Sequence, residues 1–198
     1  MKQGKVDIVD KSVAYDGFFK LERYQIRHSL FNGGMSEVIS RELFERGHAV
    51  AVLPYDPQRD EVVLLEQFRI GALGRTKGPW LTEIVAGMIE PGESAREVAE
   101  REAMEEAGCR LLELIPILNY YVSPGGTSET IQLYCGRVDA SAVSEGIYGL
   151  QHEQEDIRVI KVSFDQAVAW LKSGRIDSAA PIIALQWLMM NREKLRAG

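Results

Sequence analysis

The chain has 198 residues, 45% hydrophobic and 26% charged, enough to bury a core in one domain or one domain with a small extension. Its net charge of −6 argues against nucleic acid as a partner but allows a small phosphorylated ligand, because a bound metal can reverse the local field. Its start shows no apolar signal segment, and its longest apolar run, 181–190, is too short to span a membrane, so we expect a cytoplasmic protein without membrane contact.

The first 48 residues alternate apolar and polar side chains in three segments, 5–17, 18–34 and 36–47. Turn sequences rich in Asp, Asn and Gly separate these segments, which predicts antiparallel strands. A small group of strands buries little by itself. We therefore assign residues 1–48 to an N-terminal β-strand domain that packs on the main domain, residues 49–198, or on a second copy of the chain.

The main domain alternates strand and helix patterns. Apolar runs at 48–56 and 61–69 flank the turn-rich sequence DPQRD and predict a hairpin. We expect further strands at 81–90, 113–122, 129–139 and 157–164, and closing helices at 165–173 and 180–196. The polar, Gly-containing stretch 141–156 predicts a flexible surface loop. This order indicates an α/β (α+β) fold with a mixed sheet between helical layers.

The segment 87–109, GMIEPGESAREVAEREAMEEAGC, predicts a helix that begins near Glu93 or Ser94 and ends at Gly108. At about 100° per residue, Glu102 and Glu106 fall in the middle of a stripe of small residues. A helix normally turns such a stripe toward the core, where an unpaired carboxylate is unfavourable. We therefore expect a cation between the two carboxylates, and a divalent metal with oxygen ligands is the natural candidate.

The two cysteines, Cys109 and Cys135, have neither CxxC spacing nor a histidine cluster around them. Cysteines without such partners are typically buried free thiols of a reducing compartment. We expect both to be unpaired.

The spacing of glycines and charges in 87–109 resembles the signature box of the Nudix hydrolases at every charged and glycine position. The matching residues are Gly87, Glu93, Arg101, Glu102, Glu105, Glu106 and Gly108. Cys109 stands where the family usually has an aliphatic residue, and it is small and apolar enough to fill that place. The resemblance implies a Nudix-type α/β/α sandwich that cleaves a nucleoside diphosphate linked to another moiety, with Mg²⁺ (or Mn²⁺) and water.

The resemblance also implies roles for the residues of the box. The carbonyl of Ala86, Glu102 and Glu106 match metal ligands. Glu105 flanks the pair, as either a further ligand or a partner that orients the ligands, and it is a catalytic candidate. Arg101 and Glu93 stand where a salt bridge can fix the loop to the helix.

The substrate has to be inferred from outside the box. Pro124 lies sixteen residues beyond Gly108, the spacing that marks the ADP-ribose pyrophosphatase branch. Several other segments resemble the bacterial enzymes of that branch: 17–19, 41–49, 66–70, 79–94, 123–129, 153–159 and 176–188. The resemblance implies a homodimer that hydrolyses ADP-ribose to AMP and ribose 5-phosphate. Substrate contacts would come from Arg69, Met88, Ser123, Gly125 and Glu129, and from Phe18, Arg41 and Arg46 of N-terminal strands that reach the partner subunit.

A general base is still required, because the metal occupies the glutamates of the box. In the resembled family Glu153 matches the proton acceptor and Glu155 an additional metal ligand. A base carried on a loop is reasonable, since loop closure on the substrate delivers it and excludes water.

Plainer interpretations remain open for several of these residues. Phe18 can be a core aromatic, Arg41 and Arg46 a solvated strand face, Glu153 part of a solvated loop, and 123–126 an ordinary Pro-Gly turn. Alternative functions are the hydrolysis of another nucleotide sugar such as GDP-mannose, or a non-catalytic module that senses ADP-ribose. An RNA pyrophosphohydrolase would need a basic surface that this acidic chain lacks.

Overall fold

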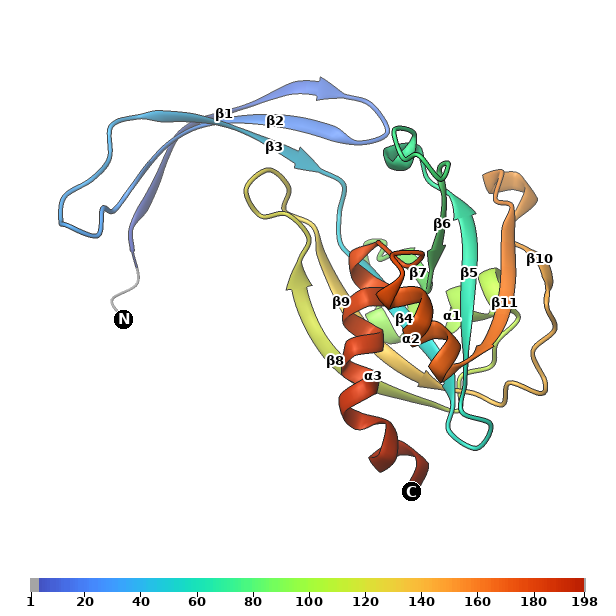
Figure 1. The fold of residues 1–198 in the computed structure, drawn as a ribbon. Helices are drawn as coiled ribbons and strands as arrows, with labels where there is room; N and C mark the ends of the chain where they lie inside the picture. Colours follow the sequence, from blue (N-terminus) through green and yellow to red (C-terminus); the bar gives the residue numbers. More distant parts are fainter. Residues whose placement is uncertain (1–3, 198) are drawn as a thin grey trace. The chain divides into compact units, whose positions relative to one another are not determined.

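The computed structural model describes residues 4–197, which form two compact units (Figure 1). Among the described residues, the first unit comprises 4–48 and 121–130, and the second comprises 49–120 and 131–197. The three predicted N-terminal strands are confirmed as β1 (Val6–Asp16), β2 (Lys20–His28) and β3 (Ile39–Glu45), an antiparallel sheet in the order β1-β2-β3. The segment 121–130 joins this unit through Phe44, whose N–H donates to the Gly126 carbonyl at 2.8 Å.

The second unit is built on a mixed eight-stranded sheet. Its strands are β4 (Ala49–Asp56), β5 (Glu61–Phe68), β6 (Trp80–Glu83), β7 (Val85–Met88), β8 (Glu113–Tyr121), β9 (Thr130–Arg137), β10 (Gly146–Tyr148) and β11 (Ile157–Ser163). The order is β10-β11-β5-β4-β9-β8, with β6 beside β5 and β7 beside β4. β4 and β9 run parallel, whereas β4 and β5 form the predicted hairpin and are antiparallel.

Helices cover both faces of this sheet. On one face α1 (Ala95–Ala107) packs on a core that includes Val50, Leu65 and Val85. On the other face α2 (Phe164–Lys172) and α3 (Ala179–Ala197) pack on a core that includes Leu53 and Leu64. Figure 1 shows α2 and α3 in front of the sheet and α1 behind it. The expected α/β/α sandwich with a mixed sheet is confirmed.

Strands β4 and β5 separate beyond their shared turn, and this separation matters for the site. They pair with each other only at Tyr55–Val62 and Asp56–Glu61. Further along, β5 pairs with β6 and β4 pairs with β7. The single strand expected at 81–90 is therefore wrong: it divides into two short strands, because each half has a different hydrogen-bonding partner.

The polar stretch 141–156 also differs from the expected flexible loop. It contains β10, which pairs with β11, and a short 3₁₀ turn, η2 (Gln151–Glu153). Another 3₁₀ turn, η1 (Ile70–Ala72), follows β5 elsewhere in the unit. β11 pairs with β5 along one edge, and the three residues of β10 pair with its other edge.

Two further expectations can be compared with the second unit. Cys109 and Cys135 are buried free thiols as expected, and burial raises the pKa of each to about 12. None of the described helices is long and apolar enough to cross a membrane.

Candidate active site

Helix α1 begins and ends where its sequence predicts. The Ser94 hydroxyl accepts a hydrogen bond from the Glu97 N–H at 3.3 Å, and the Glu97 carboxylate accepts one from the Ser94 N–H at 2.9 Å. This capping box satisfies two backbone donors of the first turn. At the other end Gly108 takes the left-handed conformation, with φ of 58°, which glycine adopts without strain.

The inner face of α1 carries the two carboxylates that the helical spacing places there. Val98, Ala99 and Ala103 are completely buried against the sheet, and Glu106 beside them is only 2% exposed. The Glu102 side chain is 13% exposed. The prediction that both glutamates point toward the core is confirmed.

Gly87 allows Glu102 to lie directly on the backbone of β7. A Cβ atom at Gly87 would stand 2.0 Å from Glu102 Oε1 and 2.3 Å from its Cδ, far inside van der Waals contact. Any other residue at this position would therefore displace the carboxylate. The first glycine of the box is needed for close approach rather than for an unusual backbone angle.

The burial of these carboxylates changes their protonation. Burial raises the pKa of Glu106 to about 8, although its hydrogen bond from the Ala86 N–H (2.9 Å) opposes the rise and Glu102 adds to it. Burial likewise raises the pKa of Glu102 to about 7, with Arg101 opposing and the negative charges of Glu105 and Glu155 contributing. Both groups lack sufficient compensating positive charge.

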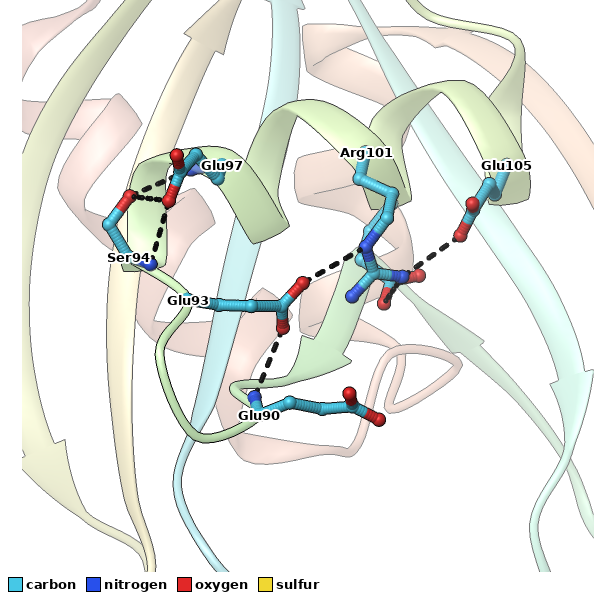
Figure 2. A network of polar contacts seen from close by, with 7 residues as sticks. Glu90, Glu93, Ser94, Glu97, Arg101 and Glu105 are labelled. Atoms are coloured by element: carbon cyan, nitrogen blue, oxygen red, sulfur yellow. Dashed lines mark hydrogen bonds and ion pairs between the residues drawn. The ribbon is translucent and has the colours of Figure 1, made fainter.

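Arg101 connects the loop before α1 to the outer side of the box (Figure 2). Its Nε lies 3.6 Å from Glu93 Oε1, and its Nη1 lies 2.9 Å from Glu102 Oε1 and 3.0 Å from Glu105 Oε2. Figure 2 shows Glu93 and Glu105 approaching the guanidinium from either side. The second oxygen of Glu93 accepts a hydrogen bond from the Glu90 N–H at 3.1 Å, which closes the loop onto the helix. The expected Arg101–Glu93 salt bridge is present.

The donor set fits a hard divalent cation. Arg101 contacts the carboxylates of Glu102 and Glu105, whereas the positive charge that acts on Glu106 is that of Arg69. Carboxylate oxygens are the ligands that Mg²⁺ prefers. Within residues 4–197 no three His, Cys, Asp or Glu side chains are already gathered as a metal cluster. The negative charges of Glu102 and Glu155 act unfavourably on the Glu106 carboxylate, and a bound cation would offset this repulsion.

Arg69 and Met88 lie at the ends of β5 and β7. Arg69 follows β5 directly, and its Nε donates to Glu83 Oε2 at 2.6 Å. Its positive charge acts against the burial-driven rise in the pKa of Glu106, so Arg69 lies near the box. Met88 ends β7 and is 38% exposed.

The segment after β10 carries the two glutamates expected outside the box. The Glu155 carboxylate accepts a hydrogen bond from the Leu150 N–H at 3.2 Å. Burial raises the pKa of Glu102 and of Glu106, and the negative charge of Glu155 adds to both rises, so Glu155 lies near the box. Glu153 lies in η2, exposed, with Oε1 3.6 Å from His152 Nε2.

The segment is anchored to the end of α1. The Gly149 N–H donates to the Glu105 carbonyl at 3.2 Å, and the Tyr148 ring packs so closely that a Cβ atom at Gly108 would lie 2.8 Å from it. The last glycine of the box thus accommodates the strand that precedes Glu153 and Glu155.

The remaining predicted substrate contacts belong to the first unit. Arg46 Nε lies 3.6 Å from Glu129 Oε1, and the Arg46 guanidinium lies 5.2 Å from the centre of the Phe19 ring. Glu129 is 6% exposed. These three side chains form an Arg46–Glu129–Phe19 cluster within the unit.

The other predicted contacts in the first unit are Ser123, Gly125, Phe18 and Arg41, of which Phe18 contacts the cluster through the Phe19 ring, with ring centroids 4.7 Å apart. The Ser123 carbonyl accepts hydrogen bonds from the N–H groups of Gly126 and Thr127, each at 3.0 Å, and so closes the turn that contains Gly125. Phe18 is 90% exposed, so the interpretation of Phe18 as a core aromatic is wrong. Arg41 is exposed and donates to the Ser40 carbonyl.

Comparison with known proteins agrees with this geometry. The NUDIX domain model matches residues 45–185. The chain belongs to the Nudix family. An ADP-ribose pyrophosphatase of Escherichia coli (strain K12) is 53% identical over 191 residues, which cover 96% of this chain and 91% of that protein. A GDP-mannose pyrophosphatase of Pectobacterium atrosepticum is 32% identical over 91% of this chain and 92% of that protein.

A solved structure described as an ADP compounds hydrolase shares the fold. Its TM-score is 0.72 over 97% of each chain, at 20% sequence identity. The family and its ADP-ribose pyrophosphatase branch are therefore those indicated by the box and by the Pro124 spacing.

Two features of this Nudix protein were missed from the sequence. Glu83 was not singled out, because its contact with Arg69 depends on the pairing of β5 with β6. Phe19 was passed over in favour of its neighbour Phe18, although Phe19 contacts Arg46. Both rings lie in the bend before β2 and contact each other, with centroids 4.7 Å apart, so no sequence pattern separates them.

Proposed function

We propose that this protein hydrolyses the pyrophosphate bond of ADP-ribose to give AMP and ribose 5-phosphate, with Mg²⁺ as cofactor and Mn²⁺ as a substitute. The observation that carries the proposal is the pair of buried, undercompensated carboxylates, Glu102 and Glu106, on the inner face of α1. Support for the substrate comes from the relative named ADP-ribose pyrophosphatase, which is 53% identical, against 32% for the one named GDP-mannose pyrophosphatase.

In this proposal the cation is held by the Ala86 carbonyl, Glu102, Glu106 and Glu155. When bound, it neutralises the pyrophosphate and lowers the pKa of the attacking water. Arg101 holds Glu102 and Glu105 in place from the outer side of the helix, and Glu93 fixes Arg101 in turn. Glu105 is a catalytic candidate because its carboxylate lies beside Glu102 without being buried like Glu106.

Glu153 is the proposed general base. It lies on the segment that β10 anchors to the end of α1, so movement of this short segment can carry it to the substrate without disturbing the helix. Its side chain is exposed, so the carboxylate is accessible to the attacking water.

The substrate contacts are proposed as two groups. Arg69 and Met88 of the second unit serve the diphosphate side, where a guanidinium suits bidentate contact with phosphate oxygens. Arg46, Glu129, Ser123 and Gly125 of the first unit, with Phe18 and Arg41, serve the nucleoside side. Glu129 can accept a hydrogen bond from a ribose hydroxyl, and an exposed phenyl ring such as Phe18 can stack on adenine.

We also propose that residues 1–48 mediate a homodimer and reach the partner subunit's substrate. The first unit exposes large apolar side chains along β1 and its following turn, including Ile8 (62%), Val13 (51%), Tyr15 (65%) and Phe18 (90%). Exposed apolar groups of this extent are typical of an interface. Analytical ultracentrifugation tests this assignment, which a monomer at micromolar concentration would refute. The two buried free thiols suit the reducing cytoplasm.

The function is tested by comparing turnover of ADP-ribose and GDP-mannose with Mg²⁺, and by identifying the nucleotide released. We expect AMP from ADP-ribose, with a kcat/KM at least about tenfold above that for GDP-mannose. A clear preference for the guanine substrate would refute the choice of ADP-ribose. Tight binding of ADP-ribose without hydrolysis would indicate a sensing module instead.

A further inference from the structure

Glu83 lies in the second unit, on the same face of the sheet as the box. It pairs across β5 and β6 with Leu65, which is buried in the core beneath α1. Residues paired across two antiparallel strands point to the same face. The neighbouring pair, Glu66 and Thr82, consequently points to the opposite face, where Glu66 meets Arg158 and Arg175.

The contact between Glu83 and Arg69 is short and specific. Arg69 Nε donates to Glu83 Oε2 at 2.6 Å, and the Arg69 N–H donates to the Pro79 carbonyl at 2.9 Å. The side chain of Glu83 is 17% exposed, and that of Arg69 is 42% exposed. Among the described residues, the terminal Nη1 and Nη2 groups of Arg69 make no hydrogen bond to the protein.

This arrangement divides the guanidinium into a fixed edge and a free edge. Glu83 engages the Nε edge, so the Nη groups remain available to an external acceptor. A pair of N–H groups on one planar fork matches two oxygens of a phosphate. The positive charge of Arg69 acts on the Glu106 carboxylate, so Arg69 lies near the box.

We infer that Glu83 is a positioning residue, which orients the Arg69 guanidinium so that its free Nη edge binds a phosphate group of the substrate. This inference rests on the proposed function, because it requires a diphosphate substrate at the box. Arginine has a long side chain with many rotamers, and fixing it in advance removes an entropic penalty from substrate binding. A carboxylate near the phosphate is electrostatically unfavourable, and the orienting effect outweighs this repulsion because Glu83 contacts the edge turned away from the acceptor.

The test compares Glu83→Ala and Glu83→Gln with Arg69→Ala and with the double variant Arg69→Ala/Glu83→Ala, using ADP-ribose and Mg²⁺. We expect Glu83→Ala to raise KM about tenfold with kcat within about threefold of wild type. Glu83→Gln keeps an acceptor without the charge and should raise KM by about threefold. In the Arg69→Ala background the Glu83→Ala change should have no further effect, because Glu83 acts through Arg69.

Glu113→Gln is the matched control. It also removes a carboxylate beside an arginine, Arg137 at 3.5 Å, but at the β8 edge of the same sheet. Its KM should equal that of wild type. If Glu83→Ala unfolds, as shown by its thermal melting, Glu83→Gln decides the question.

Several outcomes would overturn the inference: an unchanged or lower KM in both Glu83 variants, a fall in kcat alone, or the same rise in KM in the presence and absence of Arg69. A wild-type protein that does not hydrolyse ADP-ribose refutes the proposed function instead. The two failures are therefore distinguishable in one set of assays.

Discussion

Two clusters of acidic and basic side chains in the second unit differ in how their charges are balanced. Around Asp60, one carboxylate meets two guanidinium groups and a hydroxyl: Arg192 Nε and Tyr55 Oη donate to Asp60 Oδ1 at 2.8 Å each, and Arg196 Nη1 lies 2.8 Å from Oδ2. In the box, the guanidinium of Arg101 is shared by Glu93, Glu102 and Glu105.

The protonation of the two clusters reflects this balance. Burial acts to raise the pKa of Asp60, but the hydrogen bonds from Arg192 and Tyr55 prevail and lower it. Burial prevails at Glu102 and Glu106, whose pKa values rise to about 7 and about 8. The Asp60 cluster is complete as folded and joins α3 to the β4–β5 turn. The carboxylates of the box need an additional positive charge, and such uncompensated carboxylates are typical of a cation site.

The largest expected effect is on catalysis by the box. Glu106→Gln keeps the size of the side chain and an acceptor for the Ala86 N–H, but it removes the buried negative charge. We expect kcat/KM for ADP-ribose to fall by about 1,000-fold or more, because the charge needed to hold the cation is lost. Steady-state assays over a range of Mg²⁺ concentrations measure this effect.

The same variant should remain folded. An amide needs no counter-charge in the core, so the metal-free variant should melt at or above the wild-type temperature at pH 8.5. Activity within tenfold of wild type would show that Glu106 does not hold the cation.

A smaller effect, on stability alone, is expected at the other cluster. Asp60→Asn removes the charge that Arg192 and Arg196 share, and asparagine tolerates the φ of 60° at this position. We expect the free energy of unfolding at pH 7 to fall by roughly 1 to 2 kcal/mol, a modest loss because both arginines are partly exposed. Urea denaturation measures this loss, and kcat should not change.

The pH dependence of that loss has a definite sign. A carboxyl group with a lowered pKa stabilises the fold above its unfolded value of 3.8, and this contribution disappears as the pH falls through the folded value. The difference between wild type and Asp60→Asn should therefore vanish in acid. A difference that persists unchanged at pH 2.5 would contradict the assignment of the stabilisation to the Asp60 charge.

How much the sequence predicts depends on how local each feature is. The inward pair Glu102 and Glu106 follows from helical spacing alone, since residues four apart share a face. The capping at Ser94 and the end at Gly108 are also local signals, and the structure has both. The resemblance of the box adds the family, which the NUDIX match confirms.

Features that depend on strand pairing were not predicted. The residues that follow Glu83, 84–89, are an unbroken run without polar side chains, so nothing in them marks the change of partner between β6 and β7. The Arg69–Glu83 contact requires the β5–β6 register, and the assignment of 121–130 to the first unit requires the contact of Phe44 with Gly126. These contacts join residues far apart in the chain, and a composition pattern carries no information about them.

The most direct test of the claim that the box carboxylates lack compensating positive charge is the release of protons on metal binding. Calorimetric titration of the metal-free protein with Mg²⁺ at pH 7, in buffers of different ionisation enthalpy, counts the protons displaced. With pKa values of about 7 and about 8 at Glu102 and Glu106, we predict roughly one proton released per cation, falling toward zero above about pH 9. Glu113→Gln should behave as wild type, and Glu106→Gln should release fewer protons. Binding of Mg²⁺ at pH 7 without proton release would contradict the claim that the box holds uncompensated carboxylates for a cation.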